Sequence, residues 1–212
     1  LDALRDEASR RRLEVTASQM DINTDEGVGR VLPQLMKEQG GIDVLVNNAG
    51  YGLWGPGGTI SMKEMRDQFE TNFFAAFRLM RAVLPGMIER GKGTIVNISS
   101  VEGRLGTPFS GGYAASKFAL EGLSESMRVE LWPLGVRVVL VEPGLFRTNF
   151  HANQVIAESV GSADLPFRPI LERYRARRSR FDFLTGDPVK VARVVHKIVR
   201  SRRPRFRYQV GA

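Results

Sequence analysis

The segment YAASK at residues 113–117 places Tyr113 and Lys117 four positions apart. In an α-helix, residues at positions i and i+4 lie on one face, so the two side chains would point the same way. An ammonium group beside a phenol favours the phenolate and lowers the phenol pKa from about 10 toward the range of a general acid or base. The pair therefore indicates proton transfer. The alternative is that the two side chains share a helix face without any chemical role.

The elements around this pair follow from the hydrophobic pattern. Residues 111–132 read as one amphipathic helix that Pro133 ends, and three short β-branched runs read as buried strands. Small and polar residues follow each run, at 47–50, 99–100 and 143–144. Ligands of open α/β sheets bind beyond the carboxyl ends of the strands, so these residues are predicted to form one site. The alternative is that strand-to-helix turns need Gly, Asn and Ser whatever the function.

The rest of the chain continues the alternation of strands and helices. Helices are predicted over residues 2–12, 25–40, 61–90 and 187–201, a strand over 13–20, and loops with short helices over 151–185. This order predicts an α/β domain with a Rossmann-like, doubly wound parallel sheet in three layers. At 212 residues, the whole chain 1–212 fits one domain.

The composition excludes several classes of protein. The chain has no cysteine, which removes disulfides, thiolate nucleophiles and cysteine-ligated metals. Its two histidines lie far apart in the sequence, so no metal site is expected. No apolar run is long enough for a transmembrane helix, and no secretory signal is seen. The absence of cysteine fits a reducing cytosol, so a cytoplasmic location is expected.

The net charge of +8 is concentrated near the C-terminus. Residues 1–150 carry 17 Lys and Arg against 18 Asp and Glu, whereas residues 151–212 carry 14 against 5. A basic tail can bind nucleic acid or an acidic surface, but solvated arginine-rich helices are common, and nucleic acid is not expected as a partner. A second class of function stays open, that of a non-catalytic, truncated binding protein whose basic C-terminal region engages an acidic partner.

Taken together, the motifs resemble the short-chain dehydrogenase/reductase family over nearly the whole chain. Ser100 precedes Tyr113 by thirteen residues, which is similar to the spacing in that family. The residues that carry the resemblance are Asp21-Ile22, NNAG at 47–50, Asn72, Ser100, Tyr113, Lys117, Pro143-Gly144 and Thr148.

The resemblance implies a role for each of four catalytic residues. Tyr113 would be the general acid and base, and Lys117 would lower its pKa and bind the nicotinamide ribose. Ser100 would hydrogen-bond the substrate oxygen and polarise it. Asn72 would hold a water molecule that links Lys117 to solvent.

The resemblance also implies NADP or NAD as cofactor. Asp21 would contact the adenine, and Asn48 would lie along the adenosine ribose, whereas Pro143 to Leu145 and Thr148 would approach the nicotinamide and the phosphates. Two plain alternatives stay open, namely that Asp21 caps a helix and that Thr148 lies in a solvent loop. The full set of expected cofactor contacts is Asp21, Asn48, Ala49, Gly50, Tyr113, Lys117, Pro143, Gly144 and Thr148.

The glycine-rich turn that cradles the pyrophosphate in this family does not occur in the sequence. By the resemblance, the first βαβ unit is missing, and the chain is expected to be a fragment of a longer enzyme. The strand near 42–46 would then expose an edge that the first strand covers in the family.

A small-molecule alcohol or carbonyl compound is the implied substrate. Residues 145–185 would form the substrate loop, and its apolar side chains suit a hydrophobic alcohol or ketone. The alternative is that the Phe residues are ordinary core filling. A homodimer or homotetramer is expected through the helices at 61–90 and 111–132. The apolar candidates are Leu145, Phe146, Phe150, Phe167, Phe181 and Phe183.

Overall fold

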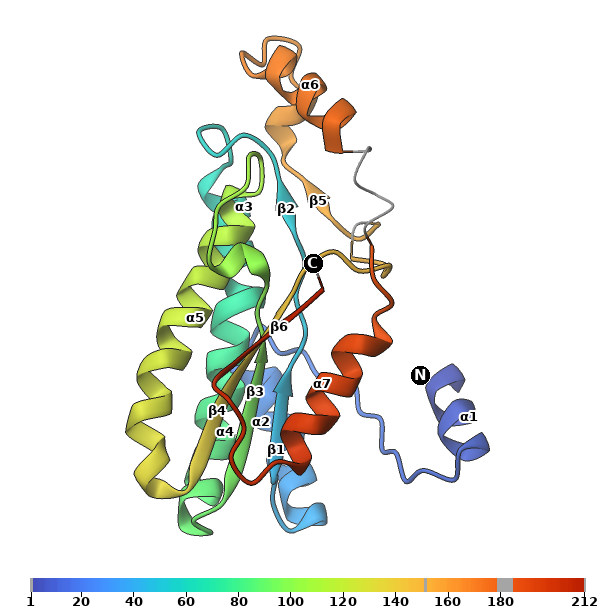
Figure 1. Ribbon diagram of the computed structural model, residues 1–212, viewed down its shortest axis with the longest axis vertical. Coiled ribbons are helices and arrows are strands. Elements are labelled where there is room, and N and C mark those ends of the chain that lie inside the picture. Colours follow the sequence, from blue (N-terminus) through green and yellow to red (C-terminus); the bar gives the residue numbers. More distant parts are fainter. Residues whose placement is uncertain (1, 151, 179–184, 212) are drawn as a thin grey trace.

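The central feature of the computed structural model, which describes residues 2–150, 152–178 and 185–211, is a four-stranded parallel sheet. The strands are β1 (Val44–Asn47), β3 (Gly93–Ile98), β4 (Val136–Pro143) and β6 (Arg207–Val210), in the order β1-β3-β4-β6. Helices cover both faces of this sheet, which gives the predicted three-layered α/β fold (Figure 1). All four strands run in one direction, so their carboxyl ends meet at one edge.

Two apolar cores hold the layers together. On one face, α2 (Asp25–Gln39), α4 (Ala75–Glu89) and α5 (Gly111–Leu131) pack on the sheet through a core that includes fully buried Met80, Met87 and Ile95. On the other face, α7 (Val189–Arg200) contributes Ile198 to a second core with Val96 and Val139. Burial on both faces explains why the strands read as continuous apolar runs.

The predicted helix over 61–90 is interrupted in the middle. It begins at Ser61, whose hydroxyl and the carboxylate of Glu64 form a reciprocal capping box. The helix α3 (Met62–Phe69) then leads into a π-helical turn, η1 (Glu70–Phe74), before α4 continues. Such widened turns are rare and occur often at functional sites, and this one contains Asn72.

A smaller part of the fold lies beyond the carboxyl edge of the main sheet. Here β2 (Leu53–Trp54) pairs with β5 (Val155–Ile156), and the short helix η4 (Glu158–Gly161) and α6 (Arg168–Arg178) follow (Figure 1). The 3-10 turns η2 (Val101–Gly103) and η3 (Trp132–Leu134) lie before and after α5 in the chain. Strands of two residues are too short to show a periodic pattern, so neither β2 nor β5 could be predicted.

The predicted strand over residues 13–20 is wrong. The segment is largely exposed and joins α1 (Asp2–Arg10), which lies to the side of the layers, to α2 (Figure 1). Alternating residues such as Leu13 and Val15 favour an extended backbone, but a strand forms only where a neighbouring strand pairs with it. No neighbour pairs with these residues in the described part of the chain.

The turn from α5 into β4 depends on a close backbone approach at Gly135. Its φ is 77°, and a Cβ there would lie 2.0 Å from the carbonyl oxygen of Gly91. A side chain at this position would therefore force apart the two turns that precede β3 and β4.

We expect Gly135→Ala to lower the free energy of unfolding by about 3 kcal/mol, because it adds both backbone strain and a backbone clash. Gly122→Ala is the matched control, since Gly122 lies on the exposed side of α5 with nothing near its Cβ position. That substitution should stabilise the chain by about 0.5–1 kcal/mol. Urea unfolding measures both, and equal effects of the two substitutions would contradict the prediction.

Candidate active site

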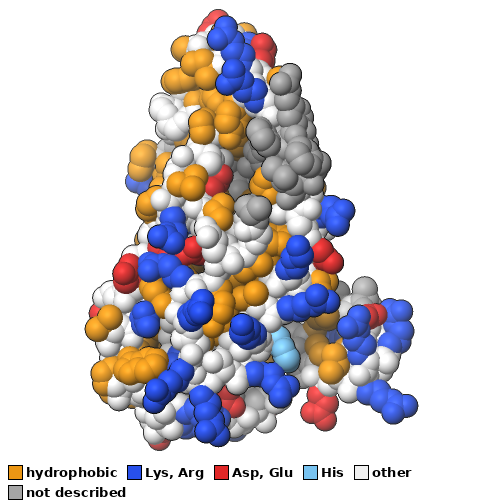
Figure 2. Space-filling view, in the orientation of Figure 1, with side chains coloured by type: hydrophobic (Ala, Val, Ile, Leu, Met, Phe, Trp, Pro, Cys, Tyr) orange, Lys and Arg blue, Asp and Glu red, His pale blue; other side chains and the backbone are white. Residues whose placement is uncertain are grey.

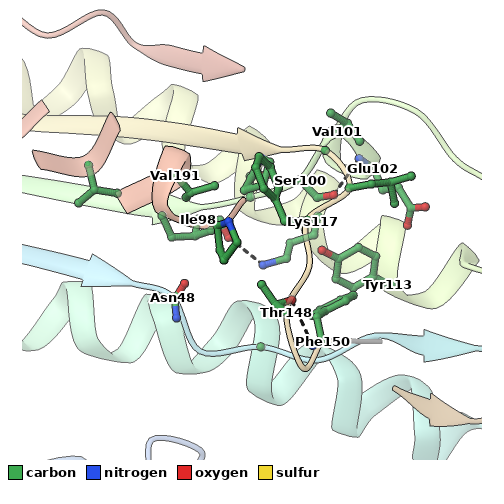
Figure 3. Close-up of a pocket in the computed structure, with 18 of the residues that line it drawn as sticks. Asn48, Ile98, Ser100, Val101, Glu102, Tyr113, Lys117, Thr148, Phe150 and Val191 are labelled. Carbon is green, nitrogen blue, oxygen red and sulfur yellow. Dashed lines mark hydrogen bonds between the residues drawn. The ribbon is translucent and has the colours of Figure 1, made fainter. Parts of the chain in front are cut away.

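A cavity of about 540 Å³ opens at the carboxyl edge of the main sheet (Figure 3). Residues at and just after the ends of β1, β3 and β4 line it, and the first two turns of α5 and α7 complete the wall. The three strand ends predicted to form one site therefore do meet. Their lining residues are Asn48 and Gly50, Ser99 and Ser100, and Pro143 and Gly144.

Tyr113 and Lys117 lie on one face of α5, as the spacing predicts, and both line the cavity. Both side chains are buried, and the Lys117 Nζ donates a 2.8 Å hydrogen bond to the carbonyl oxygen of Ile98 at the end of β3. That Nζ lies 5.8 Å from the centre of the Tyr113 ring. Figure 3 shows the Tyr113 and Ser100 hydroxyls and the Lys117 amine turned toward the same space.

Burial dominates the titration of both groups. It raises the pKa of Tyr113 to about 12, the Ser100 hydroxyl opposes this shift, and the charge of Glu102 adds to it. Burial also lowers the pKa of Lys117 to about 8. The expectation that Lys117 lowers the pKa of Tyr113 is therefore not met in this structure, because burial removes water from around the phenol and disfavours its charged form. Near neutral pH, Tyr113 is a protonated phenol, which is the form that can donate a proton.

Ser100 is fixed by the turn that follows β3. Its Oγ accepts a 3.1 Å hydrogen bond from the backbone N–H of Glu102 and thereby caps η2. The hydroxyl can still donate its own proton toward the cavity. Together with the Tyr113 hydroxyl, it can supply two donors to one substrate oxygen, which stabilises negative charge that develops there.

Asn72 does not line the cavity but positions two of its walls. Its Oδ1 accepts from the N–H of Tyr51 at 3.1 Å, and its Nδ2 donates to the Tyr51 carbonyl at 2.9 Å and to Ser116 Oγ at 3.1 Å. The amide thus joins the loop after β1 to α5. Gln68 was not predicted, yet it is fully buried and holds the same loop through Tyr51 and Leu53.

The expected cofactor contacts separate into two groups. Asn48, Gly50, Pro143, Gly144 and Thr148 line the cavity with Tyr113 and Lys117, whereas Asp21 and Ala49 do not. A Cβ on Gly50 would lie 3.0 Å from Asn72 Oδ1 and 3.7 Å from Lys117 Nζ, so the bare backbone borders this space. The Tyr113 and Thr148 hydroxyls and the Lys117 amine lie beside this open backbone. Such groups can hydrogen-bond the ribose and carboxamide of a nicotinamide dinucleotide.

Asp21 lies before α2, and its Oδ1 accepts a 3.0 Å hydrogen bond from the N–H of Asn23. The cap of α2 is Thr24, whose Oγ1 accepts from Gly27 N–H at 3.0 Å. The alternative in which Asp21 caps the helix is therefore wrong. Thr148 Oγ1 accepts from Phe150 N–H at 3.2 Å. Thr148 is exposed in the loop after β4, as the alternative has it, and it also borders the cavity.

The apolar residues predicted for the substrate loop do not all reach the cavity. Leu145, Phe146 and Phe150 line it, and the Phe150 ring packs against Tyr113 with centroids 5.4 Å apart. Phe167 instead packs with the core around Trp54, because α6 is held against β2. Phe181 and Phe183 lie outside the described residues.

A cluster of charged side chains lies behind the cavity wall and was not predicted. Glu142, which precedes Pro143, is 1% exposed, and its carboxylate is 3.4 Å from Arg207 and 3.7 Å from Arg104. Arg207 also pairs with Glu121 and Glu125 of α5, each at 3.0 Å. Burial, and then the nearby Glu121, raises the pKa of Glu142. The cluster ties β6 to α5 and to the end of β4.

Two classes of feature have no representative among residues 2–150, 152–178 and 185–211. None of the helices there has the length and apolar character needed to cross a membrane. No group of three or more His, Asp or Glu side chains in those ranges could hold a metal ion.

Comparisons with known proteins agree with this geometry. Residues 1–159 match the family model described as short chain dehydrogenase. Retinol dehydrogenase 8 of Bos taurus is 42% identical over 201 residues, which cover 91% of this chain and 63% of that protein. The 3-ketodihydrosphingosine reductase of Bacteroides thetaiotaomicron is 38% identical over 196 residues, which cover 91% and 71%. The chain therefore spans less than two thirds of the length of the retinol dehydrogenase.

Solved structures give the same result. A short-chain dehydrogenase from Streptomyces avermitilis superposes with a TM-score of 0.85 at 33% identity, over 99% of this chain and 75% of that one. A metagenomic short-chain oxidoreductase in complex with NADP has a TM-score of 0.64 at 35% identity, over 67% and 65%.

The lowered pKa of Lys117 makes a prediction about stability. The unfolded chain binds this proton up to a pKa of 10.5, whereas the folded chain releases it at about 8. Between these values the unfolded state binds more protons, so the Lys117 contribution to stability rises with pH. The penalty for burying the ammonium is fully present below the folded pKa.

We expect the free energy of unfolding of the unaltered chain, relative to Lys117→Met, to increase by about 2 kcal/mol between about pH 7 and about pH 9.5. Urea unfolding of both chains at the two pH values measures this difference. Parallel pH profiles would show that Lys117 is not desolvated as described.

Proposed function

The chain belongs to the short-chain dehydrogenase family of oxidoreductases, and from that premise we propose that it interconverts an alcohol with a ketone or aldehyde by NAD(P)-dependent hydride transfer. The observation that carries the proposal is the convergence of Tyr113, Ser100 and Lys117 on one cavity at the carboxyl edge of the sheet. This edge is where open α/β sheets bind their ligands.

In the direction of reduction, the Tyr113 phenol donates its proton to the substrate oxygen, and Ser100 donates a hydrogen bond to the same atom. When bound, a reduced nicotinamide dinucleotide would supply the hydride to the carbonyl carbon, which would give the alcohol. Loss of the proton leaves a phenolate on Tyr113. With a pKa of about 8, Lys117 is largely an ammonium at neutral pH, and this nearby charge stabilises the phenolate. Oxidation uses the same groups in reverse.

For the cofactor, we assign the nicotinamide and the phosphates to Pro143, Gly144 and Thr148, and the adenosine ribose to Asn48. All four residues line the cavity with Gly50 and Lys117. Asp21 and Ala49 lie outside this cavity, so we assign neither of them a contact with the nicotinamide end. The metagenomic oxidoreductase in complex with NADP supports NADP, and we propose NADP or NAD for this chain.

An apolar alcohol or carbonyl compound is the proposed substrate class. Leu145, Phe146 and Phe150 give the cavity an apolar wall beside Tyr113. Two of the relatives are named for retinol and for 3-ketodihydrosphingosine, both of which carry an oxygen function on a long apolar body.

We expect Tyr113→Phe to lower kcat at least about 1000-fold, because it removes the only hydroxyl proposed to transfer the proton. Dinucleotide affinity should stay within about threefold, since the ring remains in place. Turnover of retinal and of a long-chain ketone with NADPH or NADH measures the first quantity, and fluorescence titration of the dinucleotide measures the second.

Tyr174→Phe is the control, because Tyr174 packs against Phe109 and does not line the cavity. It should keep the activity of the unaltered chain. A Tyr113→Phe chain that retained most of its activity would refute the role of Tyr113.

We also propose a homodimer or homotetramer formed through the outer faces of α4 and α5. Large apolar side chains are exposed there, with Phe118 at 46% and Val129 at 73%, and Phe74 at the start of α4 is 44% exposed. Exposed apolar patches of this kind mark association surfaces. Sedimentation equilibrium is expected to give a mass of two or four chains, and a clean monomer would contradict the proposal.

A further inference from the structure

Glu121 extends the row of functional side chains on α5 by one turn. It follows Lys117 by four residues, as Lys117 follows Tyr113, so the three side chains share one face of the helix. Glu121 and Lys117 are each 5% exposed. Glutamates are almost never buried to this degree unless they are paired, and the proton transfer assigned above makes no use of this carboxylate.

The side chain of Glu121 lies directly behind the cavity wall. A Cβ on Gly103 would lie 3.1 Å from Glu121 Cγ and 2.5 Å from Ser99 Oγ, so both side chains pack against the bare backbone of η2. Ser99 itself lines the cavity. Glu121 Oε2 is 3.0 Å from the Nε of Arg207 in β6. The carboxylate is therefore held in one position between η2 and β6.

The contact with Arg207 does not explain why Glu121 is buried. Glu125, one turn further along α5, lies at the same distance of 3.0 Å from this guanidinium although its side chain is 64% exposed. Contact between α5 and β6 therefore does not require a buried carboxylate. Glu121 Oε1 is also buried and has no hydrogen-bond partner among the described residues. A charged group in this state is costly unless another charge compensates it.

The charges around Glu121 do not balance among themselves. Arg207 contacts three carboxylates, and Arg104 reaches one of them at 3.7 Å, so three negative groups share two positive ones. The raised pKa of Glu142 reflects this excess, since burial is its first cause and the charge of Glu121 its second. The charged groups that surround the row of Tyr113, Lys117 and Glu121 are Glu125 of α5, Glu102 of η2, Arg104 after η2, Glu142 of β4 and Arg207 of β6.

Lys117 is the buried cation on the adjacent turn of α5. Its Nζ donates to the Ile98 carbonyl, and Glu121 pairs with Arg207, so the amine and the carboxylate act on each other through space. Such an attraction is strong where the charges are shielded from water. Burial lowers the pKa of Lys117, and the charge of Glu121 opposes this shift. The carboxylate therefore acts against loss of the proton from Lys117.

We propose that Glu121 is a positioning residue of the reaction, whose buried carboxylate keeps the Lys117 amine in its ammonium form and is itself held in place by Arg207. This inference rests on the proposed function, because the ammonium group stabilises the phenolate that Tyr113 becomes when it donates its proton. Without the carboxylate, Lys117 loses its proton at a lower pH. A neutral amine gives the phenolate no such support.

An NMR titration of the lysine side chains tests the inference without turnover. The chain is isotopically labelled at the ε carbons of its lysines, and the Lys117 signal is the one that is missing from Lys117→Met. In the unaltered chain this signal should titrate with a midpoint at about pH 8. In Glu121→Gln, which keeps the size of the side chain, the midpoint should fall by about one pH unit.

Glu125→Gln is the matched control, because it removes an equal charge and an equal contact with Arg207 from an exposed position two turns beyond Lys117. Its midpoint should stay within about 0.3 pH units of the unaltered chain, since water and salt screen an exposed charge. Glu121→Asp restores the charge and should recover most of the shift.

Circular dichroism and thermal unfolding establish that each variant is folded. Glu121→Leu, which leaves no polar group in place of the carboxylate, should give the same fall in midpoint and replaces Glu121→Gln where that variant does not fold. An unchanged midpoint in the folded variants of Glu121 would overturn the inference. An equal fall in Glu125→Gln would overturn it as well, because the effect would then come from loosening of β6.

The pH profile of kcat/KM separates a positioning role from a structural one. With retinal or a long-chain ketone as substrate, the alkaline limb should move about one pH unit lower in Glu121→Gln, so that activity falls about tenfold above the midpoint. Well below both midpoints, the activity should return to that of the unaltered chain. A loss of the same size at every pH would show that Glu121 serves the structure alone.

Failure of the proposed function gives a different result. The NMR midpoint of Lys117 would still fall in Glu121→Gln, but the unaltered chain would turn over no alcohol or carbonyl compound with NAD(P). Turnover with an alkaline limb that does not move in Glu121→Gln would retain the oxidoreductase and reject the role of Glu121.

Discussion

The burial of Tyr113 and Lys117 against the carboxyl end of β3 is the constraint on which the rest of the site depends. An ammonium group leaves water only where fixed acceptors replace it, and here the Ile98 carbonyl takes that role at 2.8 Å. That carbonyl belongs to the last residue of β3, so the register of α5 against the strand determines where the Lys117 amine lies. The phenol one turn earlier is then set beside Ser100, which follows the same strand.

Buried polar side chains maintain this register. Asn97 lies within β3, accepts from Asn47 of β1 at 2.8 Å and donates to Ser124 of α5 at 2.8 Å. Asn72 and Gln68 do the same for the loop after β1. Each of these amides would be costly if unpaired, so the helices and the sheet can slide past one another only at a large cost in free energy. The π-helical turn helps to maintain this register, since it contains the Asn72 amide.

Much of this arrangement could be predicted from the sequence because the chemistry lies where secondary structure changes. Buried parallel strands read as apolar runs, and their ends are marked by Asn, Ser, Pro and Gly. The prediction of a strand at 13–20 failed because a pattern of residues does not supply a neighbouring strand to pair with. Arg207 and Glu142 were missed because their contact joins positions far apart in the chain. Asn97 did carry a signal, namely an amide inside an otherwise apolar strand.

The basic C-terminal region has a use within the fold itself. Arg207 of β6 reaches two glutamates of α5 and the buried Glu142 of β4, and Glu142 directly precedes the Pro143 and Gly144 that border the cavity. Removing a cation from a buried carboxylate costs several kcal/mol, so β6 is held to the site by charge as well as by its ladder of hydrogen bonds. Part of the positive charge that could be interpreted as a binding surface therefore stabilises the segments that position the proposed catalytic residues.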